Sequence, residues 1–272
     1  MQKRNILQPI TASVLILSVG ACMSATAPTE EERAYEQAVK SKDIVPASAN
    51  SRKQIKLQDP MTQATFWSLE YEKSPGDIEA ATEFAKALRM IGSEQRAAEV
   101  ASQTLALDPD NLELLTLFGK SLLSSGNAAG AVDILRRANV LNPEDVTVLG
   151  ALGVAYDQTG RHREAQNTYR RVLQMDPQNA AALSNLGLSL TLTGSPEEAE
   201  RMLRRAIEQP EAGARERQNL AMVLSLQGKF DEARALGATD LPDAQVDRNI
   251  DYFRAMLTPQ ARNYTALRGT TN

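Results

Sequence analysis

One histidine and one cysteine occur among the 272 residues, so few side chains could perform covalent or metal chemistry. A serine hydrolase needs a histidine partner for its nucleophile, and His162 is the only candidate. A zinc site of the usual ligands needs several histidines or cysteines, and a disulfide needs two cysteines. We therefore expect no catalytic residue, no metal and no cofactor, and hence no enzyme. His162 is expected on an exposed turn between two helices.

The single cysteine, Cys22, follows a segment with the layout of an export signal. Basic residues precede a short apolar run at 10–19 (ITASVLILSV), which is too short to span a membrane. The sequence VGAC at 19–22 resembles the lipobox of bacterial lipoproteins, which implies cleavage before Cys22 and lipid anchoring through it. Met23, rather than Asp, then implies sorting to the periplasmic face of the outer membrane. The alternative is a plain signal peptide with an incidental cysteine.

Composition favours helices and argues against a nucleic-acid partner. Aromatic residues make up 4% of the chain, which suits helices rich in alanine and leucine better than sheet. The formal net charge is −4, and no long run of like charges resembles a nucleic-acid-binding arm. We expect protein partners and no small-molecule substrate.

A repeat of 34 residues supplies the elements that would position a binding site. Glycine, alanine and proline each recur with this period: Gly92, Gly126, Gly160, Gly194 and Gly228; Ala97, Ala131, Ala165, Ala199 and Ala233; Pro75, Pro109, Pro143 and Pro177. The glycine should end a first helix in the left-handed conformation, the alanine should allow close packing of a second helix, and the proline should end it. This is the period of the tetratricopeptide repeat (TPR). We predict an all-α TPR solenoid, a right-handed superhelix of helix–turn–helix repeats with a C-terminal capping helix.

The same pattern divides the chain into five parts. Residues 1–21 are the expected lipoprotein signal, and 22–60 hold the lipidated cysteine and a flexible linker. Residues 61–237 form the TPR array, with a degenerate N-terminal helix and about five repeats; 238–257 form the capping segment and 258–272 a tail.

The first helices of TPR units line the concave side of a stack, so residues between their packing positions are candidates for a peptide-binding groove. These candidates are Lys86, Arg89, Lys120, Leu123, Val154, Asp157, Asn185, Leu188, Gln218, Asn219 and Met222. The groove should change from charged at its N-terminal end to apolar in the middle, which favours a partner that inserts hydrophobic side chains. The asparagines could bind a peptide backbone or simply follow the repeat consensus. The arginine pairs 136–137, 170–171 and 204–205 indicate a solvated outer face more than a phosphate-binding surface.

Several stretches together resemble the TadD family, the TPR lipoproteins of the tight-adherence (Tad/Flp) pilus system. They are LLTLFGKSLLSSG, ALGVAYDQTGRHREAQNTYRRVL, LSNLGLSLTLTGSPEEAERMLRRAI, RQNLAMVLSLQGKFDEA and the C-terminal pattern of Asn249, Tyr252, Arg254 and Met256. The resemblance implies a pilotin-like adaptor, anchored in the outer membrane, that binds the Tad secretin or other pilus assembly components. It carries over no catalytic residue. The alternative is a general periplasmic TPR scaffold that recruits cell-wall enzymes or other envelope proteins.

Overall fold

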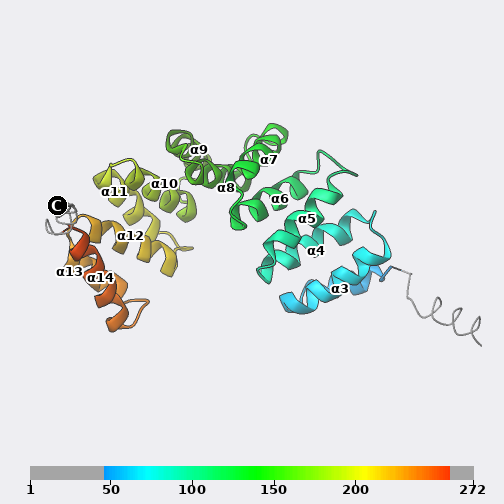
Figure 1. The fold of residues 1–272 in the computed structure, drawn as a ribbon, viewed down its shortest axis with the longest axis horizontal. Coiled ribbons are helices and arrows are strands. Elements are labelled where there is room, and N and C mark those ends of the chain that lie inside the picture. The colour runs from blue at the N-terminus through cyan, green and yellow to red at the C-terminus, as the bar shows by residue number, and fades with distance from the viewer. Residues whose placement is uncertain (1–45, 258–272) are drawn as a thin grey trace, which may run out of the picture. The chain divides into compact units, whose positions relative to one another are not determined.

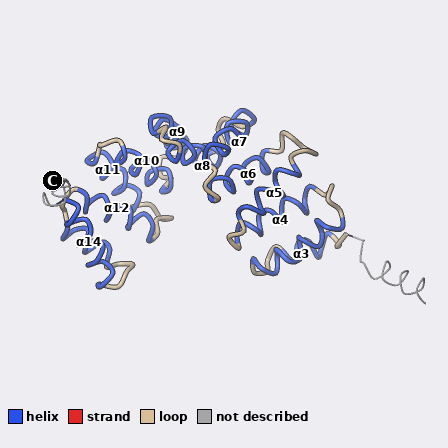
Figure 2. Tube along the Cα trace, viewed as in Figure 1, coloured by secondary structure: helices blue, strands red, loops and turns tan. Residues whose placement is uncertain are grey.

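The computed structural model describes residues 46–257. The expected signal sequence, Cys22, the start of the linker and the tail lie outside these residues. Within the described range every regular element is a helix (Figure 2). None of these helices combines the length and apolar character needed to cross a membrane.

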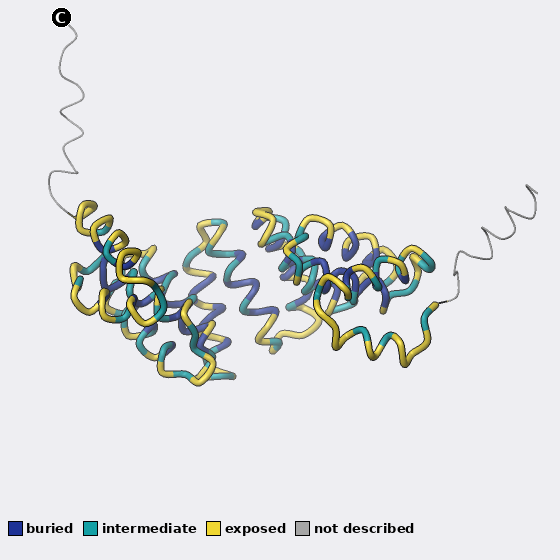
Figure 3. The backbone as a smooth tube through the Cα atoms, turned by 90° about the horizontal axis from the view of Figure 1, so that it is seen from below, coloured by how far each residue is buried: buried dark blue, intermediate teal, exposed yellow. Residues whose placement is uncertain are grey.

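Thirteen helices follow one another in residues 46–257 (Figure 1). They are α2 (Ala49–Ile55), α3 (Pro60–Lys73), α4 (Ile78–Met90), α5 (Glu94–Thr104), α6 (Leu112–Ser124), α7 (Ala128–Leu141), α8 (Val146–Gln158), α9 (His162–Met175), α10 (Ala180–Leu192), α11 (Pro196–Ile207), α12 (Ala214–Leu226), α13 (Phe230–Gly237) and α14 (Asp243–Leu257). Each helix packs mainly against its neighbours in the chain, and the first helices of successive repeats also touch. Nearly all buried residues lie within the helices, while the turns are mostly exposed (Figure 3).

The repeated sequence fixes both ends of each first helix. Asparagine or aspartate at a spacing of 34 residues caps α4, α6, α8 and α10 by accepting hydrogen bonds from backbone N–H groups of the first turn: Asp77, Asn111, Asp145 and Asn179. The five periodic glycines end the first helices with φ between 75° and 86°, a region that favours glycine. At Gly160, for example, the N–H of the next residue, Arg161, donates back to the carbonyl of Tyr156 at 2.8 Å, which closes the helix end.

The two helices of a repeat approach each other closely at two positions. The expected alanines are buried; Ala165 and Ala199, for example, are 0% exposed. A second contact was not foreseen. Gly153 on α8 lies against the ring of Tyr169 on α9, so closely that a Cβ at Gly153 would overlap the ring. Gly119 and Gly187 face Leu135 and Leu203 in the same way, and therefore this glycine sets the spacing within the three central repeats.

The N-terminal end differs from the expected linker over residues 46–59, which contain helix α2. The sequence shows no apolar stripe there, and no residue of α2 is buried. Ile55 packs half-buried against the core, and ion pairs add to this contact: Arg52 bonds Glu70 at 2.9 Å, Asp77 at 2.6 Å and Glu79 at 3.0 Å. Its guanidinium also lies 5.7 Å from the ring centre of Trp67, which is fully buried at the end of the array. The flexible-linker interpretation is therefore wrong for this stretch.

The C-terminal end closes with a short helix and a longer one. Helix α13 has eight residues, and α14 packs on α12 and α13 through buried Val246 and Ile250. Before α12, where earlier repeats have a capping aspartate or asparagine, stands Gly213. Its own N–H donates to the Glu216 carboxylate at 3.0 Å, which fixes the start of α12, but no side chain at this position accepts from the first-turn N–H groups.

Candidate functional site

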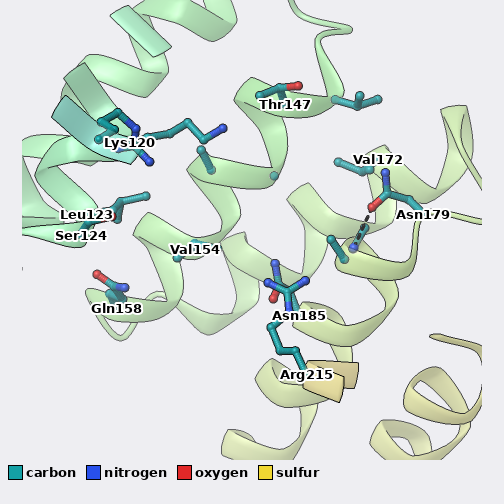
Figure 4. Close-up of a pocket in the computed structure, with 16 residues that line it drawn as sticks. Lys120, Leu123, Ser124, Thr147, Val154, Gln158, Val172, Asn179, Asn185 and Arg215 are labelled. Atoms are coloured by element: carbon teal, nitrogen blue, oxygen red, sulfur yellow. Dashed lines mark hydrogen bonds between the residues drawn. The ribbon is translucent and has the colours of Figure 1, made fainter. Parts of the chain in front are cut away.

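A hollow of about 560 Å³ lies along the first helices of the central repeats (Figure 4). Helix α8 crosses its middle, α4 and α6 border one end, and α10 and the start of α12 border the other. Five of the eleven sequence candidates line it: Arg89, Lys120, Leu123, Val154 and Asn185. The first helices therefore bring these residues, which are far apart in the sequence, to one surface.

The floor of the hollow is built from small and aliphatic side chains. Gly150, Ala151 and Val154 on α8 and Ala181 and Ala182 on α10 all line it. A Cβ at Gly150 would meet nothing within 4 Å, so this glycine leaves open space rather than a helix contact. Such a floor accepts aliphatic side chains of a bound segment, because their burial removes apolar surface from water.

Among the residues that the structure describes, three cations and no carboxylate line the hollow: Arg89, Lys120 and Arg215. Arg89 bonds Glu94 at 3.0 Å and the hydroxyl of Ser121 at 3.2 Å. Arg215 bonds its neighbour Glu216 at 2.7 Å. Both glutamates lie outside the lining, and therefore the surface that faces a ligand is positive.

Of these three cations, Lys120 is the one whose charge is least balanced by nearby carboxylates. It is half-buried and makes no ion pair with any carboxylate in residues 46–257. Burial and the positive charge of Arg89 lower the pKa of Lys120, and Asp145 offsets part of this effect. The Asp145 carboxylate already caps α8, accepting from Thr147 at 2.8 Å and Val148 at 3.1 Å.

Three family models, each described as "Tetratricopeptide repeat", match residues 122–173, 151–215 and 217–238. The fold is a TPR solenoid. Solved structures agree with this assignment. A crystal structure of MamA has 23% sequence identity and a TM-score of 0.52, covering 60% of this chain and 95% of that one. TTC0263, described as a thermophilic TPR protein in Thermus thermophilus, has 20% identity and a TM-score of 0.56, covering 66% and 98%.

MamA from Desulfovibrio magneticus RS-1, from residue 41 to its end, has 19% identity and a TM-score of 0.53, covering 67% of this chain and 96% of that one. At this identity the likeness concerns the fold. No curated protein matches the sequence. TPR repeats imply a scaffold for protein–protein interaction.

Three of the other predicted groove residues serve different roles within the TPR array or lie outside the hollow. Lys86 is paired with Glu83 at 2.9 Å and with Glu113 at 2.5 Å. Asp157 accepts hydrogen bonds from the hydroxyls of Ser189 at 2.7 Å and Tyr169 at 3.1 Å. Leu188 is half-buried and does not line the hollow.

The C-terminal candidates lie apart from the main hollow. Gln218 and Met222 line a second, smaller cavity of about 100 Å³ between α12, α13 and α14. The Asn219 amide donates to the hydroxyl of Ser184 at 2.9 Å, which links α12 to α10. Asn185 lines the main hollow instead, so the two asparagines that the sequence treats alike differ in the structure.

His162 and the arginine pairs also take roles that the sequence did not indicate. His162 begins α9 rather than lying in the turn, and its Nδ1 is 2.9 Å from a carboxylate oxygen of Asp157. The second arginine of each pair donates to a proline carbonyl of the preceding unit. No group of histidine, cysteine and carboxylate side chains in the described part of the chain is arranged to hold a metal ion.

Proposed function

We propose that this TPR protein is a non-enzymatic adaptor, anchored by lipid at Cys22 to the periplasmic face of the outer membrane, that holds a segment of a partner protein in the hollow. The proposal has the protein assist assembly or localisation of the Tad pilus secretin, in the manner of a pilotin. The hollow carries the binding part of the proposal, because it combines an apolar floor with positively charged side chains along the first helices. The lipobox and the TadD resemblance support the location and the partner.

Site-specific photocrosslinking in the envelope tests the binding surface and the partner together. A benzoylphenylalanine replacing Gln158, an exposed residue that lines the hollow, should capture the secretin or another pilus assembly protein. The matched control replaces Arg136, which is exposed on α7 and does not line the hollow. Adducts from the Arg136 position alone would overturn the hollow as the binding surface. Adducts with cell-wall enzymes alone would overturn the pilus assignment in favour of a general scaffold.

Membrane fractionation tests the anchor separately. The wild-type protein should incorporate labelled fatty acid and sediment with outer membranes. The Cys22→Ser variant should lose the label and the sedimentation, because the lipid is attached through the sulfur atom of Cys22. A labelled or membrane-bound Cys22→Ser protein would contradict anchoring through this residue.

A further inference from the structure

Lys120 differs in its ion pairing from Lys86, the residue at the equivalent position one repeat earlier. Lys86 and Lys120 are separated by one 34-residue period and occupy equivalent places on α4 and α6. Lys86 is paired with Glu83 and Glu113. One period later, Leu117 and Thr147 occupy the positions of these two glutamates. Lys120 therefore lacks both of the carboxylates that pair with the equivalent lysine, Lys86.

A half-buried ammonium without a counter-ion is unfavourable, since it has lost part of its hydration and gained no anion. Lys120 lines the hollow, beside Arg89, whose charge repels it. An anionic group of a bound ligand would therefore gain a charge-assisted hydrogen bond and relieve this repulsion. A guanidinium has five N–H donors, so Arg89 retains donors for the same anion beyond those that bond Glu94 and Ser121.

The second positive end is Arg215, at the start of α12. In Figure 4 it points toward Asn185, and Val154 lies between it and Lys120 in that view. The chain order of the helices agrees: α6 carries Lys120, α8 and α10 supply the small and aliphatic floor, and α12 carries Arg215. The hollow thus presents positive charge, then an apolar surface, then positive charge.

We infer that the hollow binds an extended, internal segment of a partner protein in which two acidic side chains flank a short aliphatic stretch. One acid meets Lys120 and Arg89, the aliphatic residues cover the floor of α8 and α10, and the second acid meets Arg215. A chain terminus would supply its carboxylate at one end only, so the two positive ends favour an internal segment. This inference rests on the proposed function, because it names the chemistry of the partner held in the proposed site.

Fluorescence anisotropy with the full-length protein in detergent micelles tests the inference. The probes are fluorescein-labelled, C-terminally amidated peptides of the form GSELVLEGS, with one to three aliphatic residues between the glutamates. At least one spacing should bind about tenfold more tightly than its glutamine counterpart, which keeps size and loses charge. Replacing the aliphatic residues by serine should also weaken binding. Equal affinity for glutamate and glutamine peptides at every spacing would overturn the inference.

Variants locate the contacts on the protein. Lys120→Gln and Arg215→Gln should each lower the affinity several-fold, and raising the salt from about 0.05 to about 0.5 M should reduce the effect of each substitution. Arg136→Gln on the outer face of α7 is the matched control and should bind as the wild type does. Unchanged affinity in Lys120→Gln, with an unchanged circular-dichroism spectrum, would overturn the assignment.

Three further outcomes separate the possibilities. If a peptide with one glutamate and a free terminal carboxylate binds more tightly than the internal probe, the ligand is a chain end and the inference fails. If no acidic peptide binds but the Gln158 crosslink still captures a pilus protein, the inference fails and the proposed function stands. If the probes bind and no pilus protein is captured, the inference stands and the proposed function fails.

Discussion

The guanidinium of Arg171 donates a hydrogen bond from Nη2 to the main-chain carbonyl oxygen of Pro143, 2.9 Å away and 28 residues earlier. The same bond joins Arg137 to Pro109 at 2.9 Å and Arg205 to Pro177 at 3.3 Å. Each one ties a second helix to the turn that ends the preceding unit. The second arginine of each pair is exposed, as a solvated outer face requires, and it also connects neighbouring units.

The first prediction concerns this tie. Arg171→Met removes the bond to the Pro143 carbonyl and should lower the free energy of unfolding by about 0.5–1.5 kcal/mol. Arg170→Met is the matched control, since Arg170 is exposed and its nearest carboxylate, Glu198, is 3.9 Å away. That variant should stay within about 0.5 kcal/mol of the wild type. Urea unfolding followed by circular dichroism measures both, and equal losses would show that the proline bond contributes nothing specific.

The second prediction compares two glycines on α8. Gly153→Ala should destabilise the protein by about 1–3 kcal/mol, because its Cβ would overlap the Tyr169 ring on α9. Gly150→Ala should stabilise it by about 0.5–1 kcal/mol, since alanine favours the helix and the added methyl meets open space. Thermal unfolding of the two variants checks the difference. A stable Gly153→Ala protein would contradict the close approach of α8 and α9.

The third prediction concerns helix α2 and uses Trp67, the only tryptophan of the chain. Burial would raise the pKa of Glu70, but hydrogen bonds from Lys73, the Ala47 N–H and Arg52 lower it overall. Burial would likewise raise the pKa of Asp77, which its bond to Arg52 and other hydrogen bonds lower overall. Carboxyl groups with lowered folded-state pKa values add stability above their unfolded values of about 4, and this stability is lost as the pH falls through the lowered values.

Acidification should therefore release α2 and shift the Trp67 emission to longer wavelength at a pH below about 4. Arg52→Gln should produce the shift at neutral pH, because it removes the bonds to Glu70, Asp77 and Glu79. Lys53→Gln, at an exposed position of the same helix, serves as the control and should leave the emission unchanged. A Trp67 spectrum that does not change in Arg52→Gln would show that α2 does not cover the ring.

The fourth prediction contrasts the two equivalent lysines. Lys120→Met should leave the unfolding midpoint unchanged or raise it, because it removes a cation that has no ion-paired carboxylate within residues 46–257. Lys86→Met should lower the midpoint, because it breaks the pairs with Glu83 and Glu113. A lysine with a lowered folded-state pKa costs stability at neutral pH, and this cost disappears as the pH rises toward the unfolded value of about 10.4. The gain from Lys120→Met should shrink over the same range, and a gain independent of pH would contradict the explanation.

The repeat and the helix ends could be predicted from sequence, because they depend on local chemistry. The periodic glycines at the ends of the first helices adopt the expected left-handed conformation. The caps at Asp77, Asn111, Asp145 and Asn179 were missed although they carry a clear signal, an aspartate or asparagine directly before each first helix. Gly119, Gly153 and Gly187 also share the period of 34 residues and could have been found by the same comparison.

The site was only partly predictable. Helical spacing identified Lys120, Leu123 and Val154 on the surface of the hollow, since a helix face follows from the sequence of that helix. The role of Asp157 could not be predicted in the same way, because its hydrogen-bond partners Tyr169 and Ser189 lie on other helices. Helix α2 was missed for a related reason. Arg52 reaches carboxylates 18 to 27 residues away, and no local pattern records such contacts.

The arginine–proline ties end at Arg205. One period later the arginine is replaced by Thr239 and the proline by Glu211, so the junction between α11 and α12 lacks this bond. Gln227, which donates to the Pro196 carbonyl at 2.9 Å, and the ion pair of Lys229 with Glu200 connect the two sides instead. Slow opening, seen as amide hydrogen exchange, should therefore start from α12 to α14. Arg215 lies on α12, on the side of the junction that opens, and Lys120 lies on the other side. A segment bound to both residues would hold the two sides together and slow amide exchange at this junction.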